Sequence, residues 1–366
     1  MTGAAIEPLV LPERPRILVV ALRRLGDVLL TTPLIRSLKR AFPAASIEAL
    51  VFAGTEGILA GNPDLAAVIT IPQRPVVAQT TALLGRVWRR YDLALSTQTG
   101  DRPTTLAWLA GRHSAGPTES DGLAGTIKRL ALSRSYVTDR EQHRVLDILR
   151  LADLLGIAAV PDIVCPSGAG RPALAPAQPY AVIHAAPMFV YKRWTAEGWR
   201  ALAATLRQRG LRVAVSGGGG DGSYLDTVWA DSDVVRCDAR LSWPELTGLI
   251  SGAEVYVGPD TAITHLAAAT GTATVALYGP TDPRIWGPWP LGGLDRPWAA
   301  SGTIQQRGNV WLVQNPQPCL PCQLEGCERR LDSHSRCLDE LSVEQVVTAV
   351  DRALERNRFR LKRLSL

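Results

Sequence analysis

The sequence predicts an α/β protein made of two similar, doubly wound parallel sheets. Short apolar runs typical of buried strands alternate with segments of helix length, and this alternation occurs twice along the chain. Between the two rounds lies a segment rich in Pro, Gly and Ala, SGAGRPALAPAQP, without periodicity. A length of 366 residues also favours two domains. We therefore expect one domain at 1–166, a linker at 167–179 and a second domain at 180–345.

The first round begins with RILVVAL at 16–22, which is typical of a strand buried on both faces of a parallel sheet. The segment RRLGDVLLTTPLIRSLKRAFP predicts a turn at Leu25-Gly26-Asp27 and then a helix that ends before Pro43. Three further strands are predicted at SIEALVF, AAVITIP and YDLALSTQ. Their spacing leaves room for a helix between neighbours, as in a doubly wound sheet.

The second round begins with YAVIHAA at 180–186 and has the same pattern. Further strands are predicted at LRVAVSG, DVVRCD, AEVYVGP and TATVALYG. The chain ends in a long helix that becomes strongly basic, and we expect its part at 346–366 to return to the first domain.

Composition indicates a folded protein of the cytosol. Apolar residues make up 46% of the chain and charged residues 20%, no apolar run reaches the 18 residues of a membrane span, and the N-terminus lacks the pattern of a signal peptide. A net charge of +6 is compatible with nucleic acid, an anionic membrane surface or a phosphorylated substrate. No nucleic-acid-binding motif is present, and we expect no such partner.

The stretch 258–289 predicts an anion site in the second domain. Gly258-Pro259 ends a strand, and Asp260 or Thr261 can cap the helix that follows, so backbone N–H groups and the positive end of the helix dipole face the strand ends. Gly279-Pro280-Thr281 opens a second loop at the same edge of the sheet. Open α/β sheets bind ligands where such loops meet.

This stretch resembles the ADP-heptose:lipopolysaccharide heptosyltransferases, glycosyltransferase family 9, whose signature is G-x-D-T/S-G-x-x-H-x-A-A followed by a G-P/S-T-x-P loop. The matching residues are Gly258, Asp260, Thr261, Ala262, His265, Ala267 and Ala268, then Gly279, Pro280, Thr281 and Pro283. Ala262 departs from the signature, which has Gly there. The resemblance implies donor binding by Asp260, Thr261, Ala262, Thr264, His265, Gly279 and Thr281.

Asp27 has two interpretations. In an arbitrary βα unit it would be the N-cap of the helix. The family, however, carries R/S-x-x-G-D-V/I-L/V-x-T-x-P here, matched by Gly26, Asp27, Val28, Leu29, Thr31 or Thr32, and Pro33. The resemblance implies that Asp27 is the general base that takes the acceptor's proton, with Arg23, Arg24 and Thr31 at the acceptor.

A basic pair, Lys192-Arg193, precedes Trp194 and a predicted helix start at Thr195. Alone it would be a solvated pair, whereas the resemblance implies that Lys192, with Arg193 beside it, holds the donor pyrophosphate. A lysine and helix N-termini can stabilise a leaving ADP without a divalent metal, and we expect no catalytic cofactor.

Glycines 217, 219 and 222 fit the pattern G-x-G-x-x-G, which raises an NAD-dependent oxidoreductase as a rival interpretation. The pattern follows the second strand of its domain rather than the first, which argues against a dinucleotide fingerprint. The same loop lets a nucleotide approach the backbone, with Asp221 as a ribose or base contact.

Four cysteines, Cys319, Cys322, Cys327 and Cys337, lie within 19 residues of one another in a Cys-rich insert at 319–337. The C-x-x-C start is typical of tetrahedral zinc or iron sites, although the later spacings are irregular for a zinc ribbon. A structural metal, reduced thiols and disulfides are the alternatives.

Taken with the resemblance, the two domains imply the GT-B architecture, in which two Rossmann-like domains face each other across a cleft. The function implied is inverting transfer of heptose from ADP-L-glycero-D-manno-heptose to a lipopolysaccharide inner-core or related acceptor. The alternatives are a GT-B enzyme for another nucleotide sugar, the NAD-dependent oxidoreductase and a non-catalytic glycan-binding protein. The acceptor is expected to be anionic and lipid-linked, at the cytoplasmic face of the inner membrane.

Overall fold

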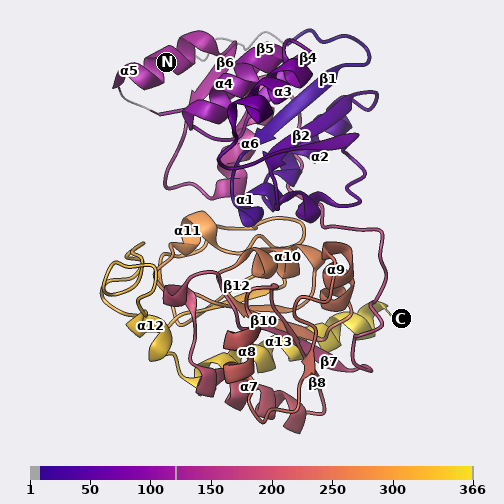
Figure 1. Cartoon of the computed structure of the whole chain (residues 1–366). Coiled ribbons are helices and arrows are strands. Elements are labelled where there is room, and N and C mark those ends of the chain that lie inside the picture. Colours follow the sequence, from indigo (N-terminus) through magenta and orange to yellow (C-terminus); the bar gives the residue numbers. More distant parts are fainter. Residues whose placement is uncertain (1–8, 120–121, 365–366) are drawn as a thin grey trace. The chain divides into compact units, whose positions relative to one another are not determined.

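The computed structural model describes residues 9–119 and 122–364 (Figure 1). The chain forms two compact units that divide between Pro166 and Ser167, where the sequence predicts the start of the linker. Residues 1–8 and 120–121 of the predicted first domain, and 365–366 of the predicted last helix, lie outside the described residues.

The first unit contains a parallel sheet of six strands. They are β1 (Arg16–Ala21), β2 (Ser46–Phe52), β3 (Ala67–Ile71), β4 (Tyr91–Ser96), β5 (Gly111–Thr118) and β6 (Arg134–Val137). Their order in the sheet is β3-β2-β1-β4-β5-β6, which is the Rossmann order. Ile17 of the central strand pairs with Ile47 on one side and Leu93 on the other.

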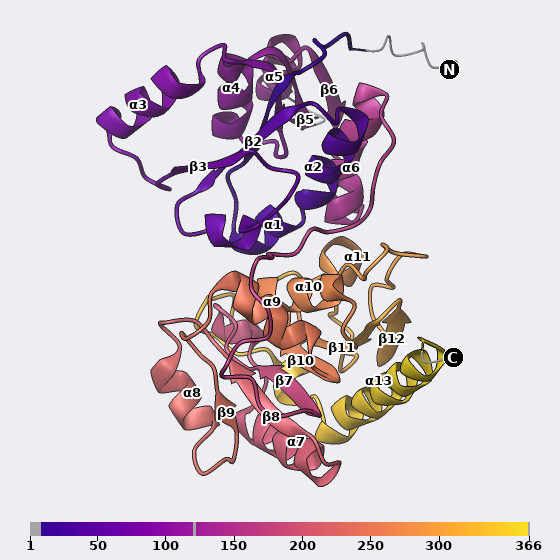
Figure 2. The ribbon, with the colours of Figure 1, turned by 90° about the vertical axis from the view of Figure 1, so that its right-hand side faces the viewer.

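Helices cover both faces of this sheet (Figure 2). They are α1 (Leu25–Leu29), α2 (Thr32–Ala41), η1 (Glu56–Leu59), α3 (Val77–Val87), α4 (Asp101–Ala110), α5 (Gly122–Ala131) and α6 (Arg144–Leu155). Successive residues of β1 point to opposite faces, so Ile17 and Val19 pack in a core with α2 and α6. Leu18 and Val20 pack in a second core with α3 and α4.

The second unit repeats this order for its first five strands in a sheet of seven strands. They are β7 (Tyr180–His184), β8 (Arg212–Ser216), β9 (Val235–Arg236), β10 (Val255–Pro259), β11 (Thr274–Leu277), β12 (Ile304–Arg307) and β13 (Val310–Val313). The order is β12-β13-β11-β10-β7-β8-β9, and only the edge pair β12–β13 is antiparallel.

The helices of the second unit are η2 (Val190–Lys192), α7 (Ala196–Gln208), α8 (Gly222–Val228), α9 (Trp243–Ser251), α10 (Ala262–Thr270), α11 (Pro283–Trp286), α12 (Arg336–Asp339) and α13 (Val343–Leu364). Helix α10 presents the small, fully or almost fully buried residues Ala267, Ala268 and Ala269, which allow it to lie close to the sheet.

The part of the last helix that was expected to return to the first domain packs in the second unit. Helix α13 contacts α7, β10, β11 and β13, all in the second unit. Val346, Ala349, Val350 and Ala353 recur at helical spacing and are buried in that unit's core. This apolar stripe explains why the described part of the helix stays with the second sheet.

The prediction of one continuous helix after β1 is wrong, because the structure has two helices, α1 and α2, separated by Leu30 and Thr31. Pro33 explains the break. A proline inside a helix clashes with the carbonyl four residues earlier, here that of Leu29, whereas it fits the first turn of a new helix. In the structure the Leu29 carbonyl accepts a hydrogen bond from the Thr32 hydroxyl at 2.8 Å.

Every strand predicted from the sequence is present, but β5, β6, β12 and β13 were not predicted. Among the described residues, no helix is both long enough and apolar enough to cross a membrane.

Candidate active site

Three side chains meet at the carboxyl ends of neighbouring strands in the second unit. Asp260 follows β10, Thr281 follows β11, and Lys192 ends the short helix η2 after β7. These strands lie side by side in the order β11-β10-β7. The Lys192 Nζ and Asp260 Oδ2 atoms are 2.5 Å apart, and the Thr281 hydroxyl donates to the same Oδ2 at 2.6 Å. The structure thus brings together residues separated by as many as 89 positions in the sequence.

The Asp260 carboxylate is ionised in this arrangement. Its residue is only 7% exposed, and burial by itself raises the pKa of a carboxyl group. The positive charge of Lys192, the hydrogen bonds from Lys192 and Thr281, and His265 together outweigh that effect and hold the pKa of Asp260 below its ordinary value. Asp260 therefore fixes the position of the Lys192 ammonium group rather than capping the next helix.

Helix α10 begins beside this cluster, with Thr261 as its N-cap. The Thr261 hydroxyl accepts a hydrogen bond from the backbone N–H of Thr264 at 3.4 Å, which decides between the two predicted caps. Thr264 is fully buried, and its hydroxyl donates to the Pro259 carbonyl at 2.5 Å. Thr264 thus holds the turn between strand and helix, while Ala262, the first helical residue, keeps partial exposure.

His265 lies one turn into α10 and is 5% exposed. Its Nδ1 atom is buried and has no hydrogen-bond partner among the described residues. Burial lowers the pKa of His265 to about 4, with Asp260 acting in the opposite direction and Lys192 in the same one. The imidazole is therefore neutral near pH 7 and leaves a polar atom beside the ion pair.

Arg193 and Asp221 lie close to the loop that follows β8. The Arg193 guanidinium stacks on the Tyr224 ring, 3.8 Å from its centroid. The Asp221 carboxylate accepts a hydrogen bond from the Gly218 N–H at 2.7 Å and so closes the glycine-rich loop. Burial raises the pKa of Tyr224, which Arg193 lowers and Asp221 raises, so both charges act on this ring.

Close packing explains why a glycine is present at position 279. A Cβ atom there would lie 2.8 Å from the Leu338 side chain and 3.3 Å from the Cys337 Sγ atom. The loop after β11 is therefore packed tightly against the Cys-rich insert, next to Thr281.

In the first unit, Asp27 lies in the first turn of α1, a helix whose N-cap is Arg24 and which has no side-chain cap. The interpretation of Asp27 as an N-cap is therefore wrong. Its side chain is half-buried, and its Oδ1 atom is buried without a hydrogen-bond partner among the described residues. Burial raises the pKa of Asp27, although Arg23, Arg144 and Arg24 act to lower it. A carboxyl group with one buried oxygen that lacks a hydrogen-bond partner, and with a raised pKa, is the arrangement expected of a general base.

Arg144, which was not predicted from the sequence, adds to the positive charge around Asp27. Arg144 begins α6 and donates to Asp147 at 3.0 Å and to the Thr97 carbonyl. A cation in the first turn of a helix interacts unfavourably with the positive end of the helix dipole. This unfavourable position of Arg144 was the one sign in the sequence that the residue has another partner.

The three residues expected at the acceptor differ in exposure. Arg23 and Arg24 are exposed at the carboxyl end of β1. Thr31 is only 2% exposed, and its hydroxyl donates to the Asp27 carbonyl at 2.9 Å. Thr31 therefore stabilises the end of α1, and the structure does not place its hydroxyl at the surface.

The four clustered cysteines line one cavity of about 90 Å³. All six cysteines of the chain are free, which excludes the disulfide alternative in this structure. Burial and the neighbouring Cys322, Cys327 and Cys319 groups raise the pKa of Cys337 to about 12. Within the described residues, no group of three or more His, Cys, Asp or Glu side chains is arranged to hold a metal ion.

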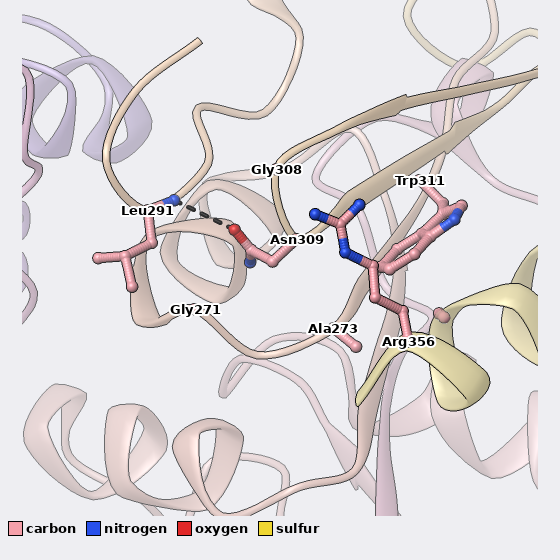
Figure 3. Close-up of a pocket in the computed structure, with 8 residues that line it drawn as sticks. Gly271, Ala273, Leu291, Gly308, Asn309, Trp311 and Arg356 are labelled. Carbon is pink, nitrogen blue, oxygen red and sulfur yellow. Dashed lines mark hydrogen bonds between the residues drawn. The ribbon is translucent and has the colours of Figure 1, made fainter. Parts of the chain in front are cut away.

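A separate pocket of about 290 Å³ lies at the opposite edge of the second sheet (Figure 3). Ala273 and Trp311, at the amino ends of β11 and β13, line it together with Arg356 of α13 and Asn309. It lies away from Asp260 and Thr281, which follow the carboxyl ends of their strands, and so it is not part of the cluster described above.

Two Rossmann-like units with parallel sheets are characteristic of the GT-B class of glycosyltransferase folds. Residues 81–295 match the sequence model of glycosyltransferase family 9 (heptosyltransferase), which is more than half of the chain. The protein belongs to glycosyltransferase family 9 and is a glycosyltransferase. This finding overturns the two minor alternatives, an NAD-dependent oxidoreductase and a non-catalytic glycan-binding protein.

Individual relatives agree with the family. The chain is 28% identical over 346 residues to lipopolysaccharide heptosyltransferase 1 of Pseudomonas aeruginosa, covering 90% of this chain and 92% of the relative. The fold is similar to that of the Escherichia coli heptosyltransferase WaaC with ADP, with a TM-score of 0.69, 21% identity and coverage of 92% and 99%. It is also similar to the dodecameric iron-containing heptosyltransferase TibC, with a TM-score of 0.55, 17% identity and coverage of 95% and 78%.

Proposed function

We propose that the protein transfers heptose, with inversion, from ADP-L-glycero-D-manno-heptose to a lipopolysaccharide inner-core sugar or a related glycoconjugate. The observation that carries this proposal is the Lys192–Asp260–Thr281 cluster beside the N-terminus of α10, in a chain of the heptosyltransferase family. The names of the relatives, lipopolysaccharide heptosyltransferases, support the choice of sugar and acceptor class.

In the proposed mechanism the second unit holds the donor diphosphate. The Lys192 ammonium supplies positive charge, and the free N–H groups of the first turn of α10, where Thr261 and Ala262 lie, supply hydrogen bonds. As transfer proceeds, the bond between the anomeric carbon and the diphosphate oxygen breaks, and its electron pair leaves with ADP. Lys192 and the helix N-terminus stabilise that charge, so we propose chemistry that needs no divalent cation.

Asp27 is proposed as the general base. The acceptor oxygen forms a bond to the anomeric carbon from the face opposite the leaving ADP, and its proton moves to the Asp27 carboxylate. Burial supports this role because it raises the pKa of Asp27 and so makes the carboxylate a better proton acceptor. Arg23 and Arg24, exposed beside it, are proposed to contact an anionic acceptor.

The remaining donor residues are proposed in supporting roles. His265, with its unpaired Nδ1 atom, is proposed to contact the donor directly, and Asp221 and Arg193 to lie near the nucleoside. A GT-B enzyme for another nucleotide sugar is the second candidate, because the cluster would recognise phosphates in any such donor.

A thermal-shift panel with ADP, UDP, GDP and NAD decides between these candidates, since a ligand that binds only the folded state raises its melting temperature. ADP should give the largest shift, and ADP-heptose should then support turnover in a mass-spectrometric transfer assay. Equal shifts with UDP or GDP would remove the adenine assignment.

We further propose a structural zinc or iron ion at Cys319, Cys322, Cys327 and Cys337. Their common cavity supports it, and so does the fold's similarity to a heptosyltransferase described as iron-containing. Because the described side chains do not form a ready ligand group, binding would require the thiols to lose protons and move together. The enzyme is proposed to work in the cytoplasm, at the membrane face that holds its lipid-linked acceptor.

A further inference from the structure

Exposed apolar side chains are concentrated on one helical layer of the first unit. Seven of the fourteen large apolar side chains that are exposed among the described residues lie within residues 76–130, a short part of a 366-residue chain. They are Val76, Val77, Trp88, Trp108, Leu123, Ile127 and Leu130. All lie in or next to helices α3, α4 and α5, which both views place together on one side of the first sheet (Figures 1 and 2).

Helix α5 has an orientation that is unusual for the surface of a soluble protein. Leu123, Ile127 and Leu130 have the spacing of one helix face and are 78%, 56% and 82% exposed. Lys128, by contrast, is 8% exposed and forms ion pairs with Asp101 at 2.9 Å and Glu119 at 3.0 Å. The ion pairs thus fix the helix with its lysine inward and its apolar stripe outward, the reverse of an ordinary amphipathic surface helix.

Two exposed tryptophans lie on the same layer. Trp88 is 56% exposed and Trp108 is 41% exposed. The backbone N–H of Arg89 donates to the Leu109 carbonyl at 3.0 Å, and the Arg89 side chain donates to the Gly111 carbonyl at 2.8 Å. These bonds hold the segments that carry the two indoles side by side. Tryptophan is enriched where proteins meet the interface between lipid and water.

The layer is also basic. Residues 76–130 contain seven Lys and Arg and four Asp and Glu. Arg86, Arg90 and Arg112 are exposed at the same helix ends as the tryptophans. We propose that helices α3, α4 and α5 form a docking surface for an anionic lipid bilayer, with the apolar residues entering the headgroup region and the arginines contacting lipid phosphates.

The observations favour a bilayer over other partners. A second copy related by a two-fold axis would place the same basic surface against itself, which like-charge repulsion disfavours. A nucleic acid would contact the arginines but would leave the stripe of Leu123, Ile127 and Leu130 without an apolar partner.

The α5 part of this surface meets the acceptor edge of the same unit. The Lys128 ammonium donates to the carbonyl of Thr99, just beyond the carboxyl end of β4, and β4 pairs with β1, whose carboxyl end leads to Asp27. The inference rests on the proposed function only in expecting a lipid-linked acceptor, and lipid binding itself is measured without donor or turnover.

The test is cosedimentation of the full chain with vesicles of phosphatidylcholine containing phosphatidylglycerol, and with vesicles of phosphatidylcholine alone. We expect binding to the anionic vesicles that weakens with salt. The triple variant Leu123→Ser/Ile127→Ser/Leu130→Ser, and separately Arg90→Glu/Arg112→Glu, should each bind at least about tenfold more weakly. The matched control Leu146→Ser/Leu331→Ser, exposed apolar positions outside the layer, should bind like the wild type.

Circular dichroism melting checks that each variant is folded, and all substitutions are at exposed positions. The inference is overturned if the wild type does not bind anionic vesicles, or if the folded triple variant binds them as the wild type does. The surface would be assigned to a second copy of the chain if light scattering shows a dimer that only the triple variant loses. It would be assigned to nucleic acid if the protein binds RNA tightly but not vesicles, and the arginine variant loses RNA binding. Vesicle binding without heptosyl transfer would refute the proposed function alone.

Discussion

Replacing Asp27 by Asn tests the proposed base most sharply. Asp27 is half-buried, and its Oδ1 atom has no hydrogen-bond partner among the described residues. Because its pKa is raised in the folded state, the folded protein binds the proton more tightly than the unfolded chain does. Stability contributed by this group is therefore present at low pH and is lost as the pH rises through the folded pKa. At neutral pH the Asp27 carboxyl group therefore opposes folding, and the Asn variant should be at least as stable as the wild type.

Activity should change in the opposite direction. Loss of a general base costs typically 10²–10⁴-fold in rate, or about 2.7 to 5.4 kcal/mol in the barrier. ADP affinity should be almost unchanged, because the proposed phosphate residues belong to the second unit and Asp27 to the first. The assays are transfer measured by mass spectrometry, ADP binding by calorimetry and unfolding by circular dichroism.

Two controls accompany this measurement. Asp153→Asn changes an exposed carboxylate of α6 and should leave the rate as in the wild type. The wild-type rate should fall at acid pH with an apparent pKa above that of an ordinary aspartate, and Asp27→Asn should lack this dependence. Turnover of Asp27→Asn within tenfold of the wild type, or a clear loss of its stability at neutral pH, would refute the reasoning.

Three more predictions follow from the second unit. Lys192→Met should weaken ADP binding in calorimetry by tenfold or more, and unchanged ADP affinity would contradict the proposed phosphate site. The same substitution should destabilise the fold by about 3–5 kcal/mol, because it leaves the buried Asp260 carboxylate without its cation. Burial lowers the pKa of His184 and of His265 to about 4, so the free energy of unfolding should decrease as the pH falls from about 6.5 towards 4. His265→Asn should make this decrease smaller in melting curves recorded over that pH range. The same pH dependence in the variant and the wild type would contradict the prediction. Metal analysis should find about one zinc or iron ion per chain, and the variant Cys319→Ser/Cys322→Ser should lack this ion. EDTA should leave heptosyl transfer intact. The metal site would be refuted if no metal is found and all thiols react freely in the native protein.

Much of the fold could be predicted because its central strands are apolar enough to be recognised without context. RILVVAL and YAVIHAA have this property, and both form the first strand of their sheets. Strands β5 (GRHSAGPT) and β12 (IQQR) do not, because they contain Gly, Pro or polar residues and depend on pairing with a neighbour. Strands of this kind are specified by the sheet around them rather than by their own residues.

The site could be predicted where its residues are close in sequence, as from Gly258 to His265. The sequence pattern places a glycine at position 258, but only the structure shows the reason. A Cβ atom there would lie 2.3 Å from the Tyr256 hydroxyl oxygen. Arg144 was not predicted because it reaches Asp27 only through the packing of α6 in the folded unit. The sequence also could not show that Thr261 caps the helix while Asp260 pairs with Lys192, because either residue is a good N-cap in isolation.

The two aspartates of the proposed site lie in different environments, which fits the different roles proposed for them. Asp260 is buried next to Lys192 and Thr281, and its pKa is lowered, so it keeps its charge and holds a cation in place. Asp27 has three arginines near enough to lower its pKa, yet burial outweighs them and the pKa is raised. A carboxylate that binds protons more readily than usual can accept one during a reaction, whereas a carboxylate held in an ion pair cannot do so without breaking it. The environments of these two groups therefore support the proposal that Asp27 accepts the acceptor's proton, whereas Asp260 holds Lys192 in position.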